Sequence, residues 1–285
     1  MDIAAQIGTT TAATRERLRL TPAQRLHVDV YGYVLLDNVL TPDEVARMKD
    51  VLYRLKAEPD LDALRVYTNQ RTDHMFHVGH LVEYDPALLA YAAHPALVPL
   101  VEEIVGGSVR LEESEAIINR RDPAIDPVTW AGKRSLPTGF HTGTRHGWGT
   151  YDENHHFHCL FVKTLAYLTD VGPDDGGTAV IPGSHRLSWP ERTIIEAARS
   201  DERLVHQVQA TAGSVLLFPE ALVHSTTAIR SDNERVVLIS GYTAPMMREW
   251  PGNELSPDFV ASLPDDLRSL ISGGDSWEWR RHGDA

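Results

Sequence analysis

Two histidines of this chain are suited to hold a metal ion. His141 follows a turn-rich segment, His224 ends the run GSVLLFPEALVH, and Arg235 begins the run RVVLISGY 11 residues after His224. If the chain turns between them, His224 and Arg235 come from neighbouring strands and can face one cavity. Imidazole is a good ligand for ferrous iron, and guanidinium binds a carboxylate through two parallel hydrogen bonds. The set therefore predicts an iron site beside a clamp for an oxo-acid cosubstrate.

The composition limits what such a site can serve. With 285 residues, of which 42% are hydrophobic and 24% charged, the chain can form a buried core. A formal charge of −13 repels a phosphate backbone, so we expect no nucleic acid polymer as a partner. The single cysteine, Cys159, excludes an internal disulfide and suits a reducing compartment. Neither an apolar run of the roughly 20 residues that span a membrane nor a signal-peptide core is found, so we expect a cytoplasmic protein without a membrane partner.

The elements that must position the site change character along the chain. Residues 1–20 are polar and aperiodic, so we expect a flexible lead-in, followed by a single domain over residues 21–285. From Ser108 onward the sequence consists of short strand-like runs separated by glycine and proline clusters. Helices first and many strands later predict an α+β domain built around a β-sandwich or jelly roll with flanking helices.

The first half of the chain carries the clearest helix signals. A strand is predicted at 33–37 and a helix at 42–55, which begins with the capping box TPDE at Thr41. Apolar residues recur at helical spacing along this segment. A second helix is predicted over 87–105, and Pro95 is a point at which it can break.

Four segments resemble the phytanoyl-CoA dioxygenase family of iron(II)- and 2-oxoglutarate-dependent enzymes. They are YGYVLLDNVLTPDEVARMK, HPALVPLVEEIVG, TDVGPDDGGTAVIPGSH and GSVLLFPEALVHSTTAIRSDNERVVLISGY, and they fall within about residues 25–245. The most specific parts are the PGSH element at 182–185 and the pairing of His224 with Arg235. The resemblance implies a double-stranded β-helix, a cupin-like variant of the jelly roll, with iron in its mouth.

The resemblance also implies roles for individual residues. His141 would be the first iron ligand and His224 the last, with 2-oxoglutarate and O2 as cosubstrates. Arg235, assisted by the hydroxyl of Thr226, would bind the distal carboxylate of 2-oxoglutarate. Family members carry aspartate or glutamate two residues after the first histidine, where this chain has Gly143.

Gly143 changes the predicted chemistry. Without the carboxylate, His141 and His224 are the two protein ligands of iron(II), and the loss of one negative charge opens a coordination position to a small anion. Chloride fits that description. Related 2-oxoglutarate halogenases show the same replacement, so the resemblance implies a halogenase, an oxidoreductase that chlorinates an unactivated aliphatic carbon, with the halide beside Gly143.

Three other interpretations stay open. Asp152 or Glu153 could supply the carboxylate, and the chain would then be a hydroxylase of a small-molecule natural product. The histidine-rich stretch 155–158 could form a separate metal site, although histidines leading into a strand are more often hydrogen-bonded or solvated. A chain that has lost iron could act as a non-catalytic binding protein, but the retained Thr226 and Arg235 argue against this.

Basic residues gather around the first predicted iron ligand. They are Arg120, Arg121, Lys133, Arg134 and Arg145. Arginine suits phosphate, so the predicted contacts to a phosphorylated small-molecule substrate are Arg120, Arg121, Arg145 and the nearby Trp148, although Trp148 and Trp189 are each also suited to the core. Overall resemblance is greatest to nucleotide halogenases of nucleoside-antibiotic biosynthesis, which chlorinate the deoxyribose of 2′-deoxyadenosine monophosphate. Indole-alkaloid and carrier-tethered substrates are the rivals. The sequence leaves the oligomeric state open.

Overall fold

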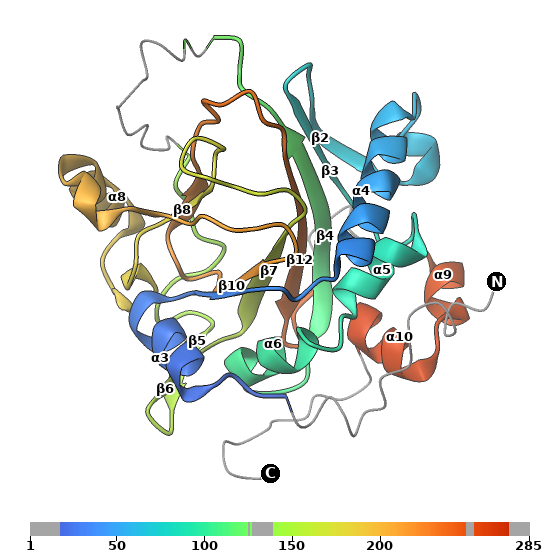
Figure 1. Ribbon diagram of the computed structural model, residues 1–285. Coiled ribbons are helices and arrows are strands. Elements are labelled where there is room, and N and C mark those ends of the chain that lie inside the picture. The colour runs from blue at the N-terminus through green and yellow to red at the C-terminus, as the bar shows by residue number, and fades with distance from the viewer. Residues whose placement is uncertain (1–17, 125, 127–138, 249–253, 274–285) are drawn as a thin grey trace.

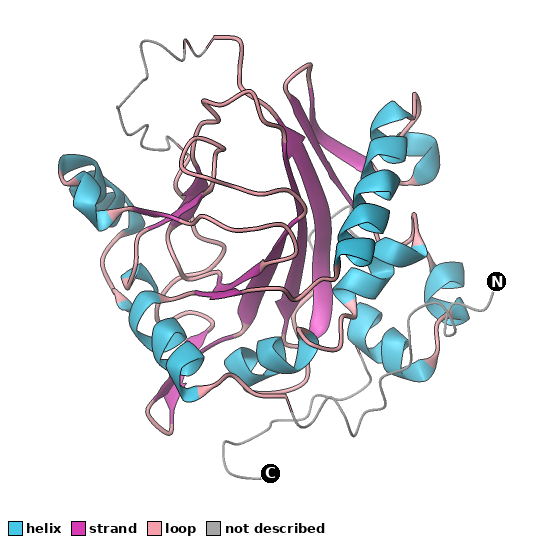
Figure 2. Ribbon diagram, viewed as in Figure 1, coloured by secondary structure: helices cyan, strands magenta, loops and turns pink. Residues whose placement is uncertain are grey.

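The computed structural model describes residues 18–124, 126, 139–248 and 254–273. Within these residues a long, twisted antiparallel sheet forms the centre of the molecule (Figure 1). Helices α4, α5, α9 and α10 lie on one side of this sheet, and a smaller sheet that contains β8 lies on the other. Figure 2 shows the same division between helices and strands. The predicted α+β fold with a jelly-roll core is confirmed.

The helices of the described residues are mostly short. They are α3 (Pro22–Tyr31), α4 (Pro42–Ala57), α5 (Pro86–Ala92), α6 (Val98–Val105), α8 (Glu191–Ser200), α9 (Pro257–Ser262) and α10 (Asp265–Ser272), with 3-10 turns η1 (Asp62–Leu64), η2 (Ser184–Arg186) and η3 (Glu202–Leu204). No helix in these ranges is both long and apolar enough to cross a membrane.

The helix predicted at 42–55 is confirmed as α4, and it begins with the capping box at Thr41. The same box begins α3, where the hydroxyl of Thr21 accepts from Gln24 and the Gln24 side chain accepts from the backbone of Thr21. This helix was not predicted. The segment 87–105 forms two helices, α5 and α6, because the chain turns between them around Pro95.

The strands form three antiparallel groups. The seven-stranded sheet has the order β1 (Val34–Leu36), β10 (Val215–Pro219), β7 (Phe161–Tyr167), β12 (Arg235–Thr243), β4 (Arg110–Asn119), β3 (Met75–Gly79) and β2 (Tyr67–Arg71). The three-stranded sheet has the order β11 (His224–Thr226), β8 (Thr178–Val180) and β9 (His206–Gln207), and β5 (Thr150–Glu153) pairs with β6 (His156–Cys159).

Alternation along the central strands separates two cores. The outward side chains of β7, β10 and β12 pack against the helices in the larger core. The inward ones include Leu165, Tyr167 and Phe218 and pack in a second cluster that faces the small sheet. The inner face therefore lies between the two sheets, where a jelly roll holds its site.

Two expectations about the ends of the fold stay as predictions. Residues 1–17 of the predicted flexible lead-in lie outside the described residues. Leu20, at its end, is buried, and its backbone N–H donates to the carboxylate of Glu103 at 2.9 Å. The single domain over 21–285 also stays a prediction.

Cys159 is fully buried, as expected for a small apolar side chain in a strand.

Candidate active site

Main-chain hydrogen bonds join the two predicted iron ligands. The backbone N–H of His141 donates to the carbonyl of His224 at 3.0 Å, and the N–H of His224 donates to the carbonyl of His141 at 3.1 Å. This antiparallel bridge places the imidazole rings with their centroids 4.3 Å apart. His224 is buried and His141 is exposed. The pair therefore lies where the inner face meets solvent.

Each imidazole is oriented by its own backbone. The Nδ1 of His141 lies 2.9 Å from the carbonyl oxygen of Gly139, and the Nδ1 of His224 lies 2.9 Å from that of Leu222. A carbonyl oxygen only accepts hydrogen bonds, so both Nδ1 atoms carry a proton, and in the neutral form of each ring Nε2 is the nitrogen with the lone pair. Histidine ligands of metals are held in this way. Burial lowers the pKa of His224 to about 4, although Glu220 opposes the shift, and the ring is neutral at physiological pH.

The space beside Gly143 contains a carboxylate that the sequence analysis did not anticipate. The N–H of Gly143 donates to the carbonyl of Glu220 at 3.0 Å. A β-carbon added to Gly143 would overlap the Oε2 of Glu220 and lie 2.9 Å from its carboxyl carbon. Glu220 is 1% exposed, and its Oε1 lies 3.9 Å from the Nε2 of His224. The expected open position beside the glycine is therefore filled by the side chain of Glu220.

Lys163 links this carboxylate to the central sheet. Its ammonium lies 2.5 Å from Glu113 and 3.5 Å from Glu220. Lys163 and Glu113 come from β7 and β4, which flank β12, and both stand opposite Gly241 in register. A β-carbon on Gly241 would lie 2.8 Å from the Cγ of Glu113. The glycine thus leaves room for the ion pair to reach across one strand.

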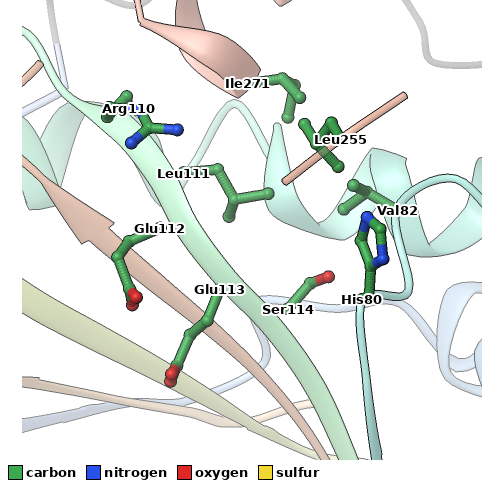
Figure 3. A pocket seen from close by; sticks show the side chains of 9 residues that line it. All are labelled: His80, Val82, Arg110, Leu111, Glu112, Glu113, Ser114, Leu255 and Ile271. Carbon is green, nitrogen blue, oxygen red and sulfur yellow. The ribbon is translucent and has the colours of Figure 1, made fainter. Parts of the chain in front are cut away.

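A β-bulge adds a second carboxylate next to Glu113. The register of β4 against β12 shifts between Gly241, which stands opposite Glu113, and Tyr242, which stands opposite Leu111, so that Glu112 is the extra residue of the bulge. Such a bulge re-aims side chains, and Figure 3 shows the carboxylates of Glu112 and Glu113 on the same side of β4. Both residues also line a small cavity between β4 and the C-terminal helices (Figure 3), together with His80, Val82, Arg110, Leu111, Ser114, Leu255 and Ile271. Neither His141 nor His224 lines that cavity.

Burial and neighbouring charges together set the protonation of Glu220, Glu113 and Lys163. Burial works to raise the pKa of Glu220, but the positive charge of Lys163 opposes it, and the pKa of Glu220 is lowered. Burial raises the pKa of Glu113 despite the attraction of Lys163. The neighbouring carboxylates raise the pKa of Lys163 against the effect of its burial. Glu220 and Lys163 are therefore an ionised pair at neutral pH.

Arg235 lies deep in the inner face and is 1% exposed. Its Nη1 donates to the carbonyl of Gly176, and its Nε is buried without a hydrogen-bond partner. It takes part in none of the ion pairs among the described residues, and burial lowers its pKa. The phenol of Tyr167, which is near enough to Arg235 to feel its charge, donates to Thr178 at 3.0 Å. An arginine held in this way is ready for a carboxylate ligand.

The remaining predicted residues are less closely grouped. Thr226 is exposed on β11, opposite Thr178, and no hydrogen bond joins it to Arg235. Arg120 donates from its Nε to the carbonyl of Asp73 at 2.9 Å. Arg121 pairs with Asp232 at 2.8 Å.

Trp148, Trp189 and Arg145 lie on the surface. Arg145 is exposed and bridges to Trp148, which is 64% exposed. Trp189 is 58% exposed, so the alternative that either tryptophan fills the core is wrong. Lys133 and Arg134 lie outside the described residues.

Two sequence alternatives have structural explanations. Asp152 pairs with Arg186 at 2.9 Å on the β5 hairpin. In the histidine-rich stretch, His156 lies 2.8 Å from Asp29, and His158 stacks on Tyr151. Among the described residues no three His, Cys, Asp or Glu side chains form a complete metal site as they stand.

The sheet order is that of a jelly-roll fold, and comparison with known families shows the class of protein. The phytanoyl-CoA dioxygenase (PhyH) family model matches residues 28–237. The chain therefore belongs to this family of iron- and 2-oxoglutarate-dependent oxygenases.

Solved structures show the same fold at low sequence identity. HygX from Streptomyces hygroscopicus with nickel and 2-oxoglutarate bound is 23% identical, with a TM-score of 0.65 over 88% of this chain and 95% of that one. The epimerase SnoN from nogalamycin biosynthesis is 20% identical, with a TM-score of 0.59 over 96% and 95%. EctD from S. alaskensis in its apoform is 20% identical, with a TM-score of 0.59 over 83% and 81%.

The residues of this chain fit both groups that the family implies. The Nε2 atoms of His141 and His224 keep their lone pairs for a metal, because both Nδ1 atoms are engaged. The unpartnered Nε of Arg235 fits a carboxylate of 2-oxoglutarate.

Sequence reasoning missed the buried charges around this pair. Glu220 is the one charged residue in the run SVLLFPEALVH before its final histidine, and Lys163 is the one charged residue in CLFVKTLAYL. Charged side chains are almost never fully buried unless they are paired. A single charge inside an apolar run was the signal that could have marked both.

Proposed function

We propose that this chain is an iron(II)- and 2-oxoglutarate-dependent enzyme that oxidises an aliphatic C–H bond of a small molecule with O2. The observation that carries the proposal is the bridged histidine pair, with both Nδ1 atoms engaged and both Nε2 atoms available. Iron bound there would couple the oxidation of 2-oxoglutarate to succinate and CO2 with oxidation of the substrate. Arg235 binds and orients the distal carboxylate, and the surrounding apolar inner face excludes water.

Hydroxylation is the product type that the site supports best. Transfer of a hydroxyl group needs no halide, and the carboxylate of Glu220 fills the space beside Gly143. A chloride in that space would meet an ionised, buried carboxylate, which repels it. Burial of like charges at close range is costly, so halide would have to displace Glu220.

Chlorination is the second candidate, and Gly143 itself favours it. The position where family members carry a carboxylate is a glycine in this chain. The carboxylate of Glu220 is at the end of a flexible side chain, and the ammonium of Lys163 attracts it from 3.5 Å. If Glu220 turns toward Lys163, the position beside Gly143 becomes available to chloride. The two candidates therefore differ in where one carboxylate rests.

A phosphorylated nucleotide remains the finer substrate proposal, supported by the exposed Arg145 and Trp148 on the loop after His141. Arginine binds phosphate, and an exposed indole can stack on a base. The engagement of Arg120 and Arg121 elsewhere reduces this support. A matched test compares 2′-deoxyadenosine monophosphate with 2′-deoxyadenosine in the wild type and in Arg145→Ala. Loss of the preference for the phosphorylated form in the variant is expected.

The function is tested by supplying iron(II), 2-oxoglutarate, O2 and a panel of small molecules, and by measuring succinate. Substrate-dependent succinate is expected in the wild type and not in His224→Ala. Product masses with and without chloride then separate hydroxylation from chlorination. A protein that binds 2-oxoglutarate but never forms succinate with any member of the panel would support the non-catalytic alternative instead.

A further inference from the structure

We propose that Glu220 is the third protein ligand of the metal and replaces the carboxylate that Gly143 cannot supply. This inference rests on the proposed function, because it concerns the same metal site. The ligand set would be His141, His224 and Glu220, with the carboxylate contributed by the second segment of the bridge instead of the first.

Backbone pairing brings Glu220 to this position. The carbonyl of Glu220 accepts hydrogen bonds from the N–H groups of Gly143 and Thr144 at 3.0 and 3.3 Å. Four residues further on, the bridge between His141 and His224 continues the same antiparallel pairing. The two segments are therefore fixed against each other at both ends. A side chain from Glu220 and a side chain from position 143 would compete for one space, which the glycine leaves to the glutamate.

The distance between Glu220 and His224 is compatible with two ligands that have yet to close on an ion. Two atoms bound side by side to one metal at about 2.1 Å are about 3 Å apart. The Oε1 of Glu220 lies 3.9 Å from the Nε2 of His224. A movement of the carboxylate by about 1 Å would bring Oε1 to that distance from His224. As the side chains stand, no three-ligand cluster is found among the described residues.

Lys163 is the positioning residue for this carboxylate. Its ammonium lies 3.5 Å from Glu220 and is itself held by Glu113 across Gly241. A charged partner at this distance limits the rotation of the carboxylate. Because the ammonium contacts Oε1, the other oxygen, Oε2, faces Gly143.

Metal affinity distinguishes coordination from simple charge pairing. Co²⁺ is titrated into the wild type, Glu220→Gln and Glu113→Gln, and its visible absorption reports both affinity and coordination. Glu113→Gln is the matched control, because it removes a carboxylate from the same lysine but not from the space beside Gly143. We expect Glu220→Gln to weaken Co²⁺ binding at least tenfold and to change the absorption spectrum, and Glu113→Gln to stay within about threefold.

Equal effects of the two substitutions, or none, would overturn the inference. If the wild type binds neither Co²⁺ nor 2-oxoglutarate, the proposed function fails. If the wild type and Glu220→Gln bind both equally well, only the inference fails.

A second variant keeps the test valid if Glu220→Gln does not fold. Gly143→Asp combined with Glu220→Ala moves the carboxylate to the family position and removes the overlap between the two side chains. We expect this double variant to bind Co²⁺ within about tenfold of the wild type, and Gly143→Asp alone to bind it less well than the double variant. Tighter binding by the single variant would contradict a fixed role for Glu220.

Discussion

Replacing Arg235 should separate the binding of 2-oxoglutarate from the binding of metal. The guanidinium is 1% exposed, and its Nε has no protein partner. Truncating one member of a buried, hydrogen-bonded charge pair costs about 2 to 5 kcal/mol. At about 1.4 kcal/mol for each factor of ten, Arg235→Ala should weaken 2-oxoglutarate roughly 30-fold to 4,000-fold. Arg235→Lys, which keeps the charge but loses the planar fork, should fall between the wild type and Arg235→Ala.

The assay is calorimetric titration of 2-oxoglutarate into the Co²⁺-loaded protein, with Co²⁺ affinity measured separately. Metal affinity should change by less than about threefold, because no hydrogen bond or ion pair joins Arg235 to either histidine. Arg192→Ala is the control, since Arg192 is 89% exposed on α8. Equal losses of metal and 2-oxoglutarate would show that Arg235 supports the fold of the site. An unchanged affinity for 2-oxoglutarate would show that the clamp lies elsewhere.

Three further results are expected. Gly143→Ala should lower the free energy of unfolding, measured in denaturant, by about 1 to 3 kcal/mol. The same substitution made in a Glu220→Ala protein should have no such cost. An equal loss in the wild type and in Glu220→Ala would mean that the two side chains do not compete. Burial works to raise the pKa of Asp29, but Arg25 and other partners hold it below its usual value, so its stabilisation is present above the unfolded pKa of about 3.9 and is lost as the pH falls through the folded value. Asp29→Asn should therefore be less stable than the wild type at pH 7, and a difference that does not shrink below about pH 4 would contradict this. Burial raises the pKa of Cys159 to about 12, so the native thiol should react with a disulfide reagent only as fast as the chain opens, and rapid reaction would contradict its burial.

Local sequence signals predicted some of the helices and strands, but they missed others. The capping box at Thr41 precedes an apolar pattern at helical spacing, and the helix was located correctly. Thr21 begins an equivalent box with Gln24, but α3 has only Arg25 and Val28 fully buried, so no apolar stripe drew attention to it. The strands of the second half were recognisable by their apolar runs, whereas β2 is almost wholly exposed and carries no such pattern.

The candidate site could be predicted in part because its two histidines and its arginine stand at positions that the resemblance identifies. Glu220 could not be placed from the pattern alone. Its position depends on pairing between two segments that are separated by 77 residues along the chain, Gly143 and Glu220. The exposure of Trp148 and Trp189 depends on loops whose course the local sequence does not determine.

The main-chain bridge between His141 and His224 has a consequence for how such a site can evolve. Hydrogen bonds between peptide groups do not depend on side-chain identity, so these bonds hold the two segments together whatever residues they carry. A carboxylate can then be lost from one segment and gained on the other by separate point mutations, without an intermediate that fails to fold. The glycine and the glutamate of this chain are what such an exchange would leave behind. Sites of this kind can therefore change the origin of a ligand while keeping its place in space.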